Sequence, residues 1–457
     1  MIHKYKLNDT YIVVDVNSGA VHGVDQIAYE LLGDAMDAEN FKVIAIENYK
    51  KLVDKFGEEK VEEAFEELLM LIDEEMLFSD EPFENYAPDS TARPILKSLC
   101  LHICHDCNLR CKYCFAGTGA FGGTRSMMSS EVGKAAIDLI IKESAHRHNL
   151  EVDFFGGEPL MNFEVVKEIV AYAKSKETEH NKNFRFTLTT NALGLIDDKI
   201  GYINETMHNV VLSIDGRKET NDKMRLKLDN SGSYDSILPK IKKLVDAREG
   251  KNYYVRGTFT RENLDFSNDV LHLADLGFKQ ISVEPVVANC ESGYDLRFED
   301  LPILFNEYEK LAKEYVKRDD SEDSFRFFHF MIDLNDGPCI AKRTSGCGAG
   351  HEYTAVTPEG DLYPCHQFVG IEEFKIGDVF EGLKNEETRT KFQTSNITTR
   401  EECSKCWAKY YCSGGCVANA WQFNKDINVP YAVGCELEKK RVEVALWIKA
   451  NTLQGDN

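Results

Sequence analysis

The feature that most constrains the fold is a regular alternation of strand-like and helix-like runs between residues 94 and 290. Strand-like residues recur in six runs, and apolar residues at helical spacing fill the intervals between them. Six such units favour a parallel sheet covered by helices. Because a complete barrel of this kind has eight strands, we expect an α/β fold with a partial, open (β/α)6 barrel. The expected strands are 95–103, 150–155, 184–190, 209–214, 253–259 and 280–287, and the expected helices include 131–143, 164–174, 234–246 and 267–276.

Three cysteines follow the first expected strand. Cys107, Cys111 and Cys114 form a C-x3-C-x2-C sequence within eight residues. A structural zinc site normally uses four protein ligands, and a four-iron cluster normally uses four thiolates. Three thiolates would leave one iron open to a ligand, at the end of the sheet where barrel enzymes carry their active sites. The alternatives are unligated cysteines and half of a zinc site.

Residues suited to binding a small ligand lie at or just after the ends of the later strands, except for Arg256, which lies on the fifth expected strand. Glycines let backbone groups approach a ligand closely, hydroxyls and amides suit a ribose, and an arginine pairs with a carboxylate in a bidentate manner. The candidate residues are Gly156, Gly157, Glu158, Thr190, Asn191, Ser213, Arg225 and Arg256.

The cysteine spacing followed by Gly156-Gly157-Glu158-Pro159 resembles the radical SAM superfamily. The resemblance implies that the open iron chelates S-adenosylmethionine (SAM) and that one electron splits it into methionine and a 5′-deoxyadenosyl radical. It also implies that Tyr113 lies against the adenine and that the glycine segment binds the methionine amino group. Arg225 and Arg256 both remain candidates for the SAM carboxylate.

A second cysteine array lies near the carboxyl terminus and comprises Cys347, Cys365, Cys403-x2-Cys406-x5-Cys412-x3-Cys416 and Cys435. This order of thiols resembles the SPASM domain, an auxiliary-cluster extension of some radical SAM enzymes. The resemblance implies two further [4Fe–4S] clusters, hence three in the chain. Either Cys339 is the fourth ligand of the proximal cluster, or the fourth iron of that cluster has no protein ligand. We favour the open iron. A pair of zinc knuckles is the alternative, and Cys100, Cys104 and Cys290 are assigned no ligand role. The implied ligands are Cys403, Cys406, Cys412 and Cys435 for the distal cluster, and Cys347, Cys365 and Cys416 for the proximal cluster.

Charge and composition exclude several classes of partner. The 457 residues carry a net charge of −23, which argues against nucleic acid and against an anionic membrane surface. We find neither a signal peptide nor an apolar run long enough to span a membrane. Fourteen cysteines in a chain of this kind indicate metal ligands in a reducing compartment, so a cytoplasmic location is expected.

The pattern divides the chain into four parts. Residues 1–85 read as short strands followed by helices, which favours a winged-helix-like domain for a leader peptide. Residues 94–290 form the barrel, 291–336 a helical bridge and 337–450 the SPASM domain.

This organisation is similar to maturases of ribosomally made peptides, and most similar to SCIFF maturases. The segments around Gly346–Tyr353 and Thr357–Phe368 carry the likeness. It implies a thioether between a cysteine sulfur and a backbone carbon, with a threonine-like acceptor, in a cysteine-rich precursor bound through its leader. An external one-electron reductant is also implied.

Two alternatives stand beside this reading. Sulfatase-maturing relatives carry an aspartate base where this chain has His366, which weakens an aldehyde-forming reaction without excluding it. A module that binds zinc or a leader peptide without catalysis is the alternative of another class.

Overall fold

A mixed sheet of eleven strands organises the computed structural model, which describes residues 1–81, 94–288, 291–334 and 340–452. Its centre is six parallel strands that lie side by side in chain order, so the sheet winds in one direction. These strands are β4 (Ser98–Cys104), β6 (Asn149–Gly156), β7 (Asn183–Thr190), β8 (Asn209–Ser213), β10 (Tyr254–Phe259) and β11 (Gln280–Pro285).

Short strands extend both edges of this parallel core. β12 (Arg326–Phe327) pairs with β11, and β13 (Tyr353–Val356) pairs with β4, both in the parallel sense. The antiparallel strands β14 (Asp361–Tyr363), β15 (Gly377–Asp378) and β16 (Gly382–Leu383) follow β13. Within the described residues the two sheet edges, β12 and β16, do not pair with each other. The expected open barrel is confirmed, and the sheet is wider than its six central units.

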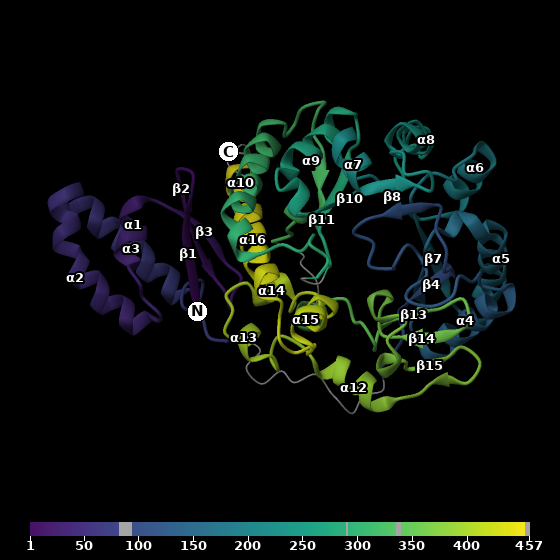
Figure 1. The fold of residues 1–457 in the computed structure, drawn as a ribbon. Helices are drawn as coiled ribbons and strands as arrows, with labels where there is room; N and C mark the ends of the chain where they lie inside the picture. The colour runs from purple at the N-terminus through teal and green to yellow at the C-terminus, as the bar shows by residue number, and fades with distance from the viewer. Residues whose placement is uncertain (82–93, 289–290, 335–339, 453–457) are drawn as a thin grey trace.

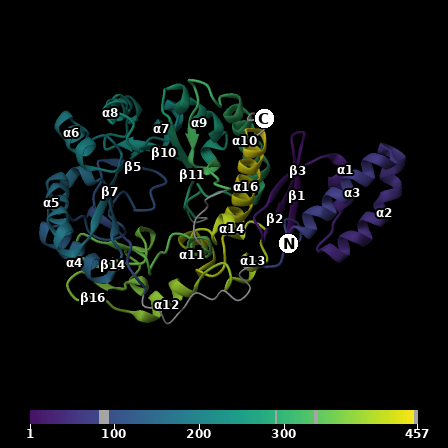
Figure 2. The same cartoon turned by 180° about the vertical axis from the view of Figure 1, so that it is seen from behind.

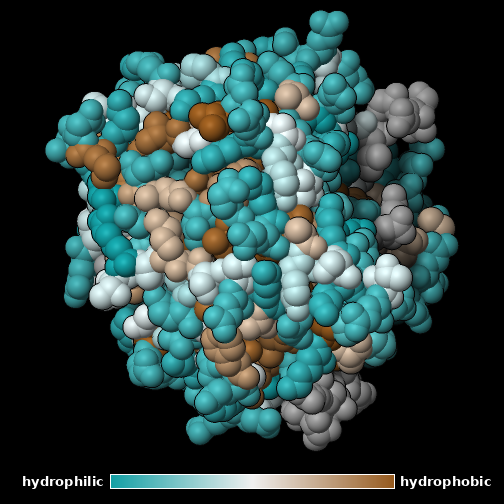
Figure 3. Space-filling model, turned by 90° about the vertical axis from the view of Figure 1, so that its right-hand side faces the viewer, coloured by the Kyte–Doolittle hydropathy of each residue, from teal (hydrophilic) through white to brown (hydrophobic). Residues whose placement is uncertain are grey.

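Helices cover the outside of the barrel (Figure 1). They are α4 (Ser130–Glu143), α5 (Phe163–His180), α6 (Asp197–Thr206), α7 (Lys218–Met224), α8 (Tyr234–Asp246) and α9 (Phe266–Asp275). Helix α8 shows why they pack there, since Tyr234, Ile237, Ile241 and Leu244 recur at helical spacing and are buried. The face that carries the helices on the right of Figure 1 is mostly hydrophilic, with hydrophobic atoms in small patches (Figure 3).

A two-stranded antiparallel sheet holds the first cysteine loop. β5 (Leu109–Cys111) pairs with β9 (Arg225–Lys227), and Cys111 lies opposite Arg225. This pairing was not foreseen, because a strand of three residues leaves no periodic pattern in the sequence.

The amino-terminal domain is a three-stranded antiparallel sheet covered on one face by three helices. It comprises β1 (Ile2–Leu7), β2 (Thr10–Asp15), β3 (Val21–Val24), α1 (Gln26–Leu32), α2 (Ala38–Phe56) and α3 (Glu58–Asp73). One face of the sheet belongs to a hydrophobic core shared with its own helices, and the other face joins the main core. Helices α10 (Leu301–Lys317) and α16 (Ala432–Thr452) lie between this domain and the barrel in both views (Figures 1 and 2).

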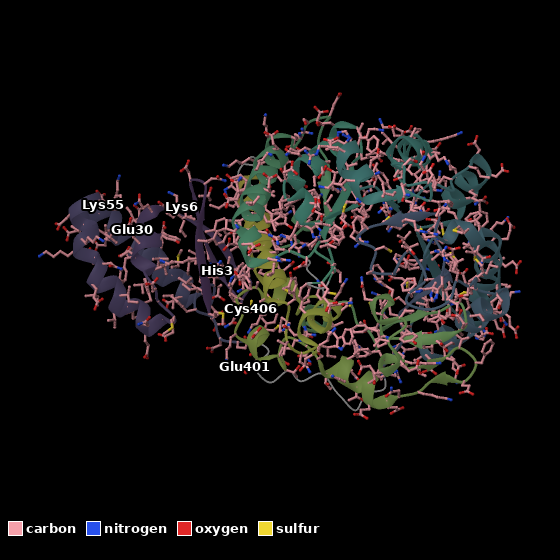
Figure 4. All side chains as sticks on the ribbon, in the orientation of Figure 1. His3, Lys6, Glu30, Lys55, Glu401 and Cys406 are labelled. Atoms are coloured by element: carbon pink, nitrogen blue, oxygen red, sulfur yellow. The ribbon has the colours of Figure 1, made fainter. Side chains whose placement is uncertain are left out.

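Side chains of β1 anchor the domain to the carboxyl-terminal segment. The His3 ring stacks on Trp407 with centroids 3.7 Å apart, and its Nε2 lies 3.0 Å from Glu443 Oε1. The Tyr5 hydroxyl donates to the Glu443 carbonyl at 2.7 Å. His3 therefore lies beside the segment that contains Cys406 (Figure 4).

The carboxyl-terminal segment is built from short elements and shares the barrel sheet through β13–β16. The expected helical bridge contains one long helix, α10, and the edge strand β12. Cys290 and Cys339 lie outside the described residues. No described helix combines the length and apolar character needed to cross a membrane. The short elements of this segment are α11 (Ile340–Ser345), η5 (His366–Phe368), η6 (Glu372–Phe374), α12 (Glu386–Thr394), α13 (Glu401–Ser404), α14 (Lys409–Cys412) and α15 (Val417–Asn424). Four further short helical turns lie earlier in the chain, at η1 (Pro159–Asn162), η2 (Arg261–Asn263), η3 (Phe298–Asp300) and η4 (Phe328–Phe330).

Two positions on α2 test whether the amino-terminal domain depends on its own core. Phe41 is fully buried there, whereas Ile46 on the same helix is 73% exposed. Phe41→Ala should destabilise the domain by about 3–5 kcal/mol, and Ile46→Ala should have little effect. Hydrogen exchange should speed up in α1–α3 of the Phe41 variant and stay unchanged in β6 and β7. Equal loss of protection in the barrel would contradict two separate cores.

Candidate functional site

A cavity of about 440 Å³ lies at the carboxyl ends of the barrel strands. Cys107, Cys111 and Cys114 line one side of it, while His366 and Gln367 of the carboxyl-terminal segment line another. The two cysteine-bearing parts of the chain therefore face one chamber.

Backbone contacts fix the first cysteine loop against the end of β6. The Gly157 amide donates to the Cys104 carbonyl at 2.8 Å, and the Glu158 amide donates to the Asp106 carbonyl at 2.9 Å. A Cβ atom at Gly157 would lie 1.9 Å from the Asp106 carbonyl oxygen, and one at Gly156 would lie 2.5 Å from the Cys104 carbonyl oxygen. Only glycine fits, because both walls are backbone.

The Glu158 carboxylate binds polar groups at the end of the neighbouring strand β7. It accepts hydrogen bonds from the Leu160 amide at 3.0 Å, the Thr190 hydroxyl at 2.7 Å and the Asn191 amide at 2.8 Å. Burial raises the pKa of Glu158, and these donors oppose the rise. The Asn191 side-chain amide then donates to the Cys107 sulfur at 3.5 Å. Glu158 therefore positions Asn191 beside the first cysteine.

Tyr113 belongs to a second buried polar group. Its hydroxyl donates to the Asp215 carboxylate at 2.7 Å and accepts from Arg225 Nη1 at 2.8 Å. Arg225 Nη1 also lies 3.7 Å from Asp215 Oδ1, and the Arg225 Nε has no hydrogen-bond partner. The tyrosine ring and the Arg225 guanidinium are thus held at the cavity wall beside Cys111.

The three thiols are close enough to affect one another. Burial raises the pKa of Cys107 to about 12 and that of Cys111 to about 11, and the neighbouring cysteines add to both shifts. Without a cation the thiols of Cys107 and Cys111 stay protonated at neutral pH, so the site suits a metal cluster that stabilises thiolates. Cys104 differs, since its thiol donates to the carbonyls of Asp106 and Glu158. It supports the loop as a neutral thiol.

The carboxyl-terminal thiols fall into two groups. Cys403, Cys406, Cys412 and Cys435 influence one another electrostatically, and burial raises the pKa of Cys412 and of Cys435 to about 11. Cys347, Cys365 and Cys416 form the other group. No three Cys, His, Asp or Glu side chains among the described residues have the spacing for a single metal ion. A cluster of four irons needs its thiolates further apart than one ion does.

Arg256 on β10 also lines the cavity. Its Nε is 3.9 Å from Glu284 Oε1, and Glu284 Oε2 lies 3.0 Å from His329 Nε2. His329 Nδ1 accepts from Arg441 Nη1 at 2.8 Å. Burial alone would raise the pKa of Glu284, but His329 and Arg256 hold it well below its usual range.

His366 and Tyr353 stand between the cavity and Cys365. His366 Nδ1 lies 3.0 Å from the Tyr353 hydroxyl and 3.8 Å from the Cys365 sulfur. Burial, together with the Arg256 charge, lowers the pKa of His366 to about 4. The imidazole is therefore neutral at physiological pH.

The cavity also contains residues that the sequence did not single out. Asp153 on β6 and Glu284 on β11 line it, and Asp215 is buried behind Tyr113. Strand alternation was the available signal, because Asp153 has the same parity in β6 as the cavity residue Phe155. All nine residues expected to contact SAM line this cavity: Tyr113, Gly156, Gly157, Glu158, Thr190, Asn191, Ser213, Arg225 and Arg256.

Two family models match the chain. The model of a 4Fe-4S single cluster domain matches residues 98–239, and the SPASM model of an iron-sulfur cluster-binding domain matches residues 347–407. A cysteine-type anaerobic sulfatase-maturating enzyme of Clostridium novyi is 27% identical over 342 residues, which span 71% of this chain and 87% of that protein.

Two solved structures share the fold. Native anSMEcpe with bound AdoMet and Kp18Cys peptide has a TM-score of 0.63 at 20% identity, covering 79% of this chain and 100% of that one. Streptococcus suis SuiB bound to precursor peptide SuiA has a TM-score of 0.53 at 15% identity, covering 94% of this chain and 97% of that one. The second coverage extends to most of the amino-terminal domain.

Gly157→Ala tests the contact between β6 and the cysteine loop. The added methyl group must displace the Asp106 backbone, so we expect loss of the iron bound by the first cysteine loop and loss of SAM cleavage. Iron analysis and 5′-deoxyadenosine assays measure both. Gly201→Ala is the control, because a Cβ there meets nothing within 4 Å in helix α6. Unchanged iron content in the Gly157 variant would contradict the steric argument.

Proposed function

We propose that this chain, a radical SAM/SPASM protein similar to the anaerobic sulfatase-maturating enzymes, forms a thioether in a ribosomally made cysteine-rich peptide. The observation that most supports this proposal is one cavity that is lined both by the first cysteine loop and by the residues directly after Cys365. A sulfur held at one side and a carbon facing the other would meet inside it. The sulfur would come from a peptide cysteine and the carbon from the backbone of an acceptor residue such as threonine.

The first cysteine loop and its neighbours fit SAM. In this proposal Gly156, Gly157 and Glu158 receive the methionine amino group, and Tyr113 faces the adenine. The polar strand ends at Thr190, Asn191 and Ser213 are available to the ribose.

Arg225 is the better candidate for the SAM carboxylate. It pairs with Cys111 across the β5–β9 sheet and is held beside it by Tyr113 and Asp215. Arg256 instead lies near Glu284, and its charge also acts on Asp153 and His366. The two arginines therefore have different surroundings, and Arg225 is the one that lies beside the cysteines of the first cluster.

Three [4Fe–4S] clusters complete the proposed enzyme. Cys107, Cys111 and Cys114 would hold the first, Cys347, Cys365 and Cys416 the proximal one, and Cys403, Cys406, Cys412 and Cys435 the distal one. When bound, the first cluster would supply the electron that splits SAM into methionine and the 5′-deoxyadenosyl radical, and the auxiliary clusters would accept the surplus electron, with an external reductant providing the initial electron. We infer that the remaining iron position of the proximal cluster is open to the peptide thiol.

The chain's own residues position the peptide and exclude water. Phe115 and Phe155 line the cavity beside His366, with ring centroids 5.5 and 5.1 Å from the imidazole. These rings give the chamber an apolar wall against which a peptide side chain can pack. The neutral His366 imidazole shares a hydrogen bond with the Tyr353 hydroxyl. This position therefore offers no carboxylate base.

The amino-terminal domain is the proposed leader site. In the described residues β3 pairs only with β2, whereas β1 lies against α16 and Trp407. An extended leader can therefore add to the β3 edge through backbone hydrogen bonds. The precursor would be held there while its cysteine-rich core reaches the cavity.

Oxidation of a cysteine side chain to an aldehyde is the second candidate, favoured by the likeness to the sulfatase-maturating enzyme. Both reactions need the same radical. They differ in whether the peptide sulfur ends bonded to carbon within the peptide.

Product mass after thiol alkylation separates the two. A thioether removes two hydrogens and one alkylatable thiol from the peptide, and we expect that result. A short open reading frame beside this gene that encodes several cysteines would supply the substrate to test. A product that keeps every alkylatable thiol would contradict thioether formation, and loss of sulfur would indicate the aldehyde.

Iron content tests the proposed clusters and the open position. Three clusters give about twelve irons per chain after anaerobic reconstitution, since each holds four. We expect Cys339→Ala to retain about twelve and Cys365→Ala to lose about four. Loss of about four irons from the Cys339 variant would make Cys339 a ligand and contradict the open position. Stoichiometric zinc, with no formation of 5′-deoxyadenosine, would contradict the proposal that the protein is a radical SAM enzyme.

A further inference from the structure

We propose that Asp153 is the group that removes the proton from the substrate thiol, a role that rests on the thioether reaction proposed above. Asp153 lies on β6 and lines the cavity between the first cysteine loop and the proximal array. It takes the place of the aspartate that is missing after Cys365, but it approaches from the barrel side of the chamber.

The position of Asp153 is defined by four neighbouring strands. It lies opposite Cys100 of β4 and Thr187 of β7 in the sheet register. Thr189 of β7 donates a hydrogen bond to it, and the Arg256 charge on β10 acts on it. Tyr353 of β13 is the remaining ionisable neighbour, and its own hydroxyl bonds Cys100.

The hydrogen-bonding capacity of Asp153 is incompletely used. Its Oδ1 atom is buried and has no hydrogen-bond partner. The Glu158 and Asp215 carboxylates nearby are bonded on both oxygens by protein donors. A buried carboxylate oxygen without a donor is costly, so it indicates a partner that arrives with the substrate.

The electrostatic surroundings suit a proton acceptor. Burial raises the pKa of Asp153 to about 7, while Arg256 and Thr189 oppose the rise. A base whose pKa lies near the working pH combines adequate basicity with a substantial ionised fraction. The Cys100 thiol and the Tyr353 hydroxyl keep their protons, because burial raises the pKa of both well above the usual values.

The reaction balances with this assignment. The acceptor carbon loses one hydrogen atom to the 5′-deoxyadenosyl radical, and the thiol loses its proton to the Asp153 carboxylate. The sulfur–carbon bond then forms, and the surplus electron passes to the iron–sulfur clusters. Asp153 returns its proton to solvent between turnovers.

Asp153→Asn tests the role, since the amide keeps the shape but cannot accept the proton. Thioether formed per 5′-deoxyadenosine should fall about 100-fold, while 5′-deoxyadenosine formation continues. The wild-type single-turnover rate should rise with pH through about 7, because the base acts when ionised, and the variant should lose this rise. Glu151→Gln is the matched control: the same strand and the same side-chain parity, at the exposed end of β6.

A binding measurement without turnover gives a second readout. N-acetylcysteine methylamide is a small thiol that resembles a peptide cysteine. At about pH 8, above the pKa of Asp153, the wild-type carboxylate is ionised and can accept a hydrogen bond from this thiol when it binds the reconstituted enzyme. The Asn variant, which has no charge at this position, should bind the thiol more than tenfold more weakly. Calorimetry measures the affinity of both proteins.

Several outcomes would overturn the role of Asp153. They are an unchanged thioether yield and pH profile in the Asn variant, equal affinity of both proteins for the small thiol, or loss of the pH dependence in His366→Gln instead. Failure of the thioether reaction appears separately, since the wild-type product itself would then keep every alkylatable thiol.

Discussion

The site depends on the close approach of two backbone segments, the end of β6 and the loop that carries the first cysteines. Two hydrogen bonds of 2.8 and 2.9 Å join them, and there is no room for a side chain at Gly157. This contact fixes the position of the cysteine loop at the end of the barrel. It also brings Glu158 to the end of β7, where the carboxylate orients Asn191 toward Cys107. One steric constraint thus arranges the loop, the strand ends and the cavity wall together.

Helix α16 lies between the amino-terminal domain and the barrel and contacts both, and it also carries a cysteine of the carboxyl-terminal array (Figure 1). Cys435 near its start belongs to the distal cysteine group. Six residues later in the same helix, Arg441 contacts His329, which lies 3.0 Å from Glu284, the neighbour of Arg256 in the cavity. Glu443 contacts His3 and Tyr5 of the amino-terminal domain. Because these contacts come from one continuous helix, the proposed leader site, the distal array and the cavity wall have a fixed spacing.

Local patterns allowed the sequence to predict the central strands, the helices between them and the residues around the cavity. The six central strands begin and end within about three residues of their expected positions. Cys107, Cys111, Cys114 and the Gly156-Gly157-Glu158 segment were found because their spacing is short and specific. The cavity is lined by every residue that the strand ends suggested for SAM.

Other features depend on contacts that no local pattern contains. The strand β12 has two residues and β13 has four, which is too short for a periodic signal. His3 and Glu443 are 440 positions apart, so only the folded chain brings them together. Asp153 is a charged residue in an apolar strand, and its position in the chamber depends on the register of β6 against β4 and β7.

The central claim is that a peptide sulfur enters the cavity from the side of the proximal array. Electron–nuclear double resonance tests it most directly, with a peptide whose cysteine is replaced by selenocysteine carrying the magnetic selenium isotope. The account predicts selenium coupling on an auxiliary cluster, retained when Cys107, Cys111 and Cys114 are all replaced by alanine. Absence of coupling in the peptide-bound enzyme, or its loss in that variant, would contradict the account.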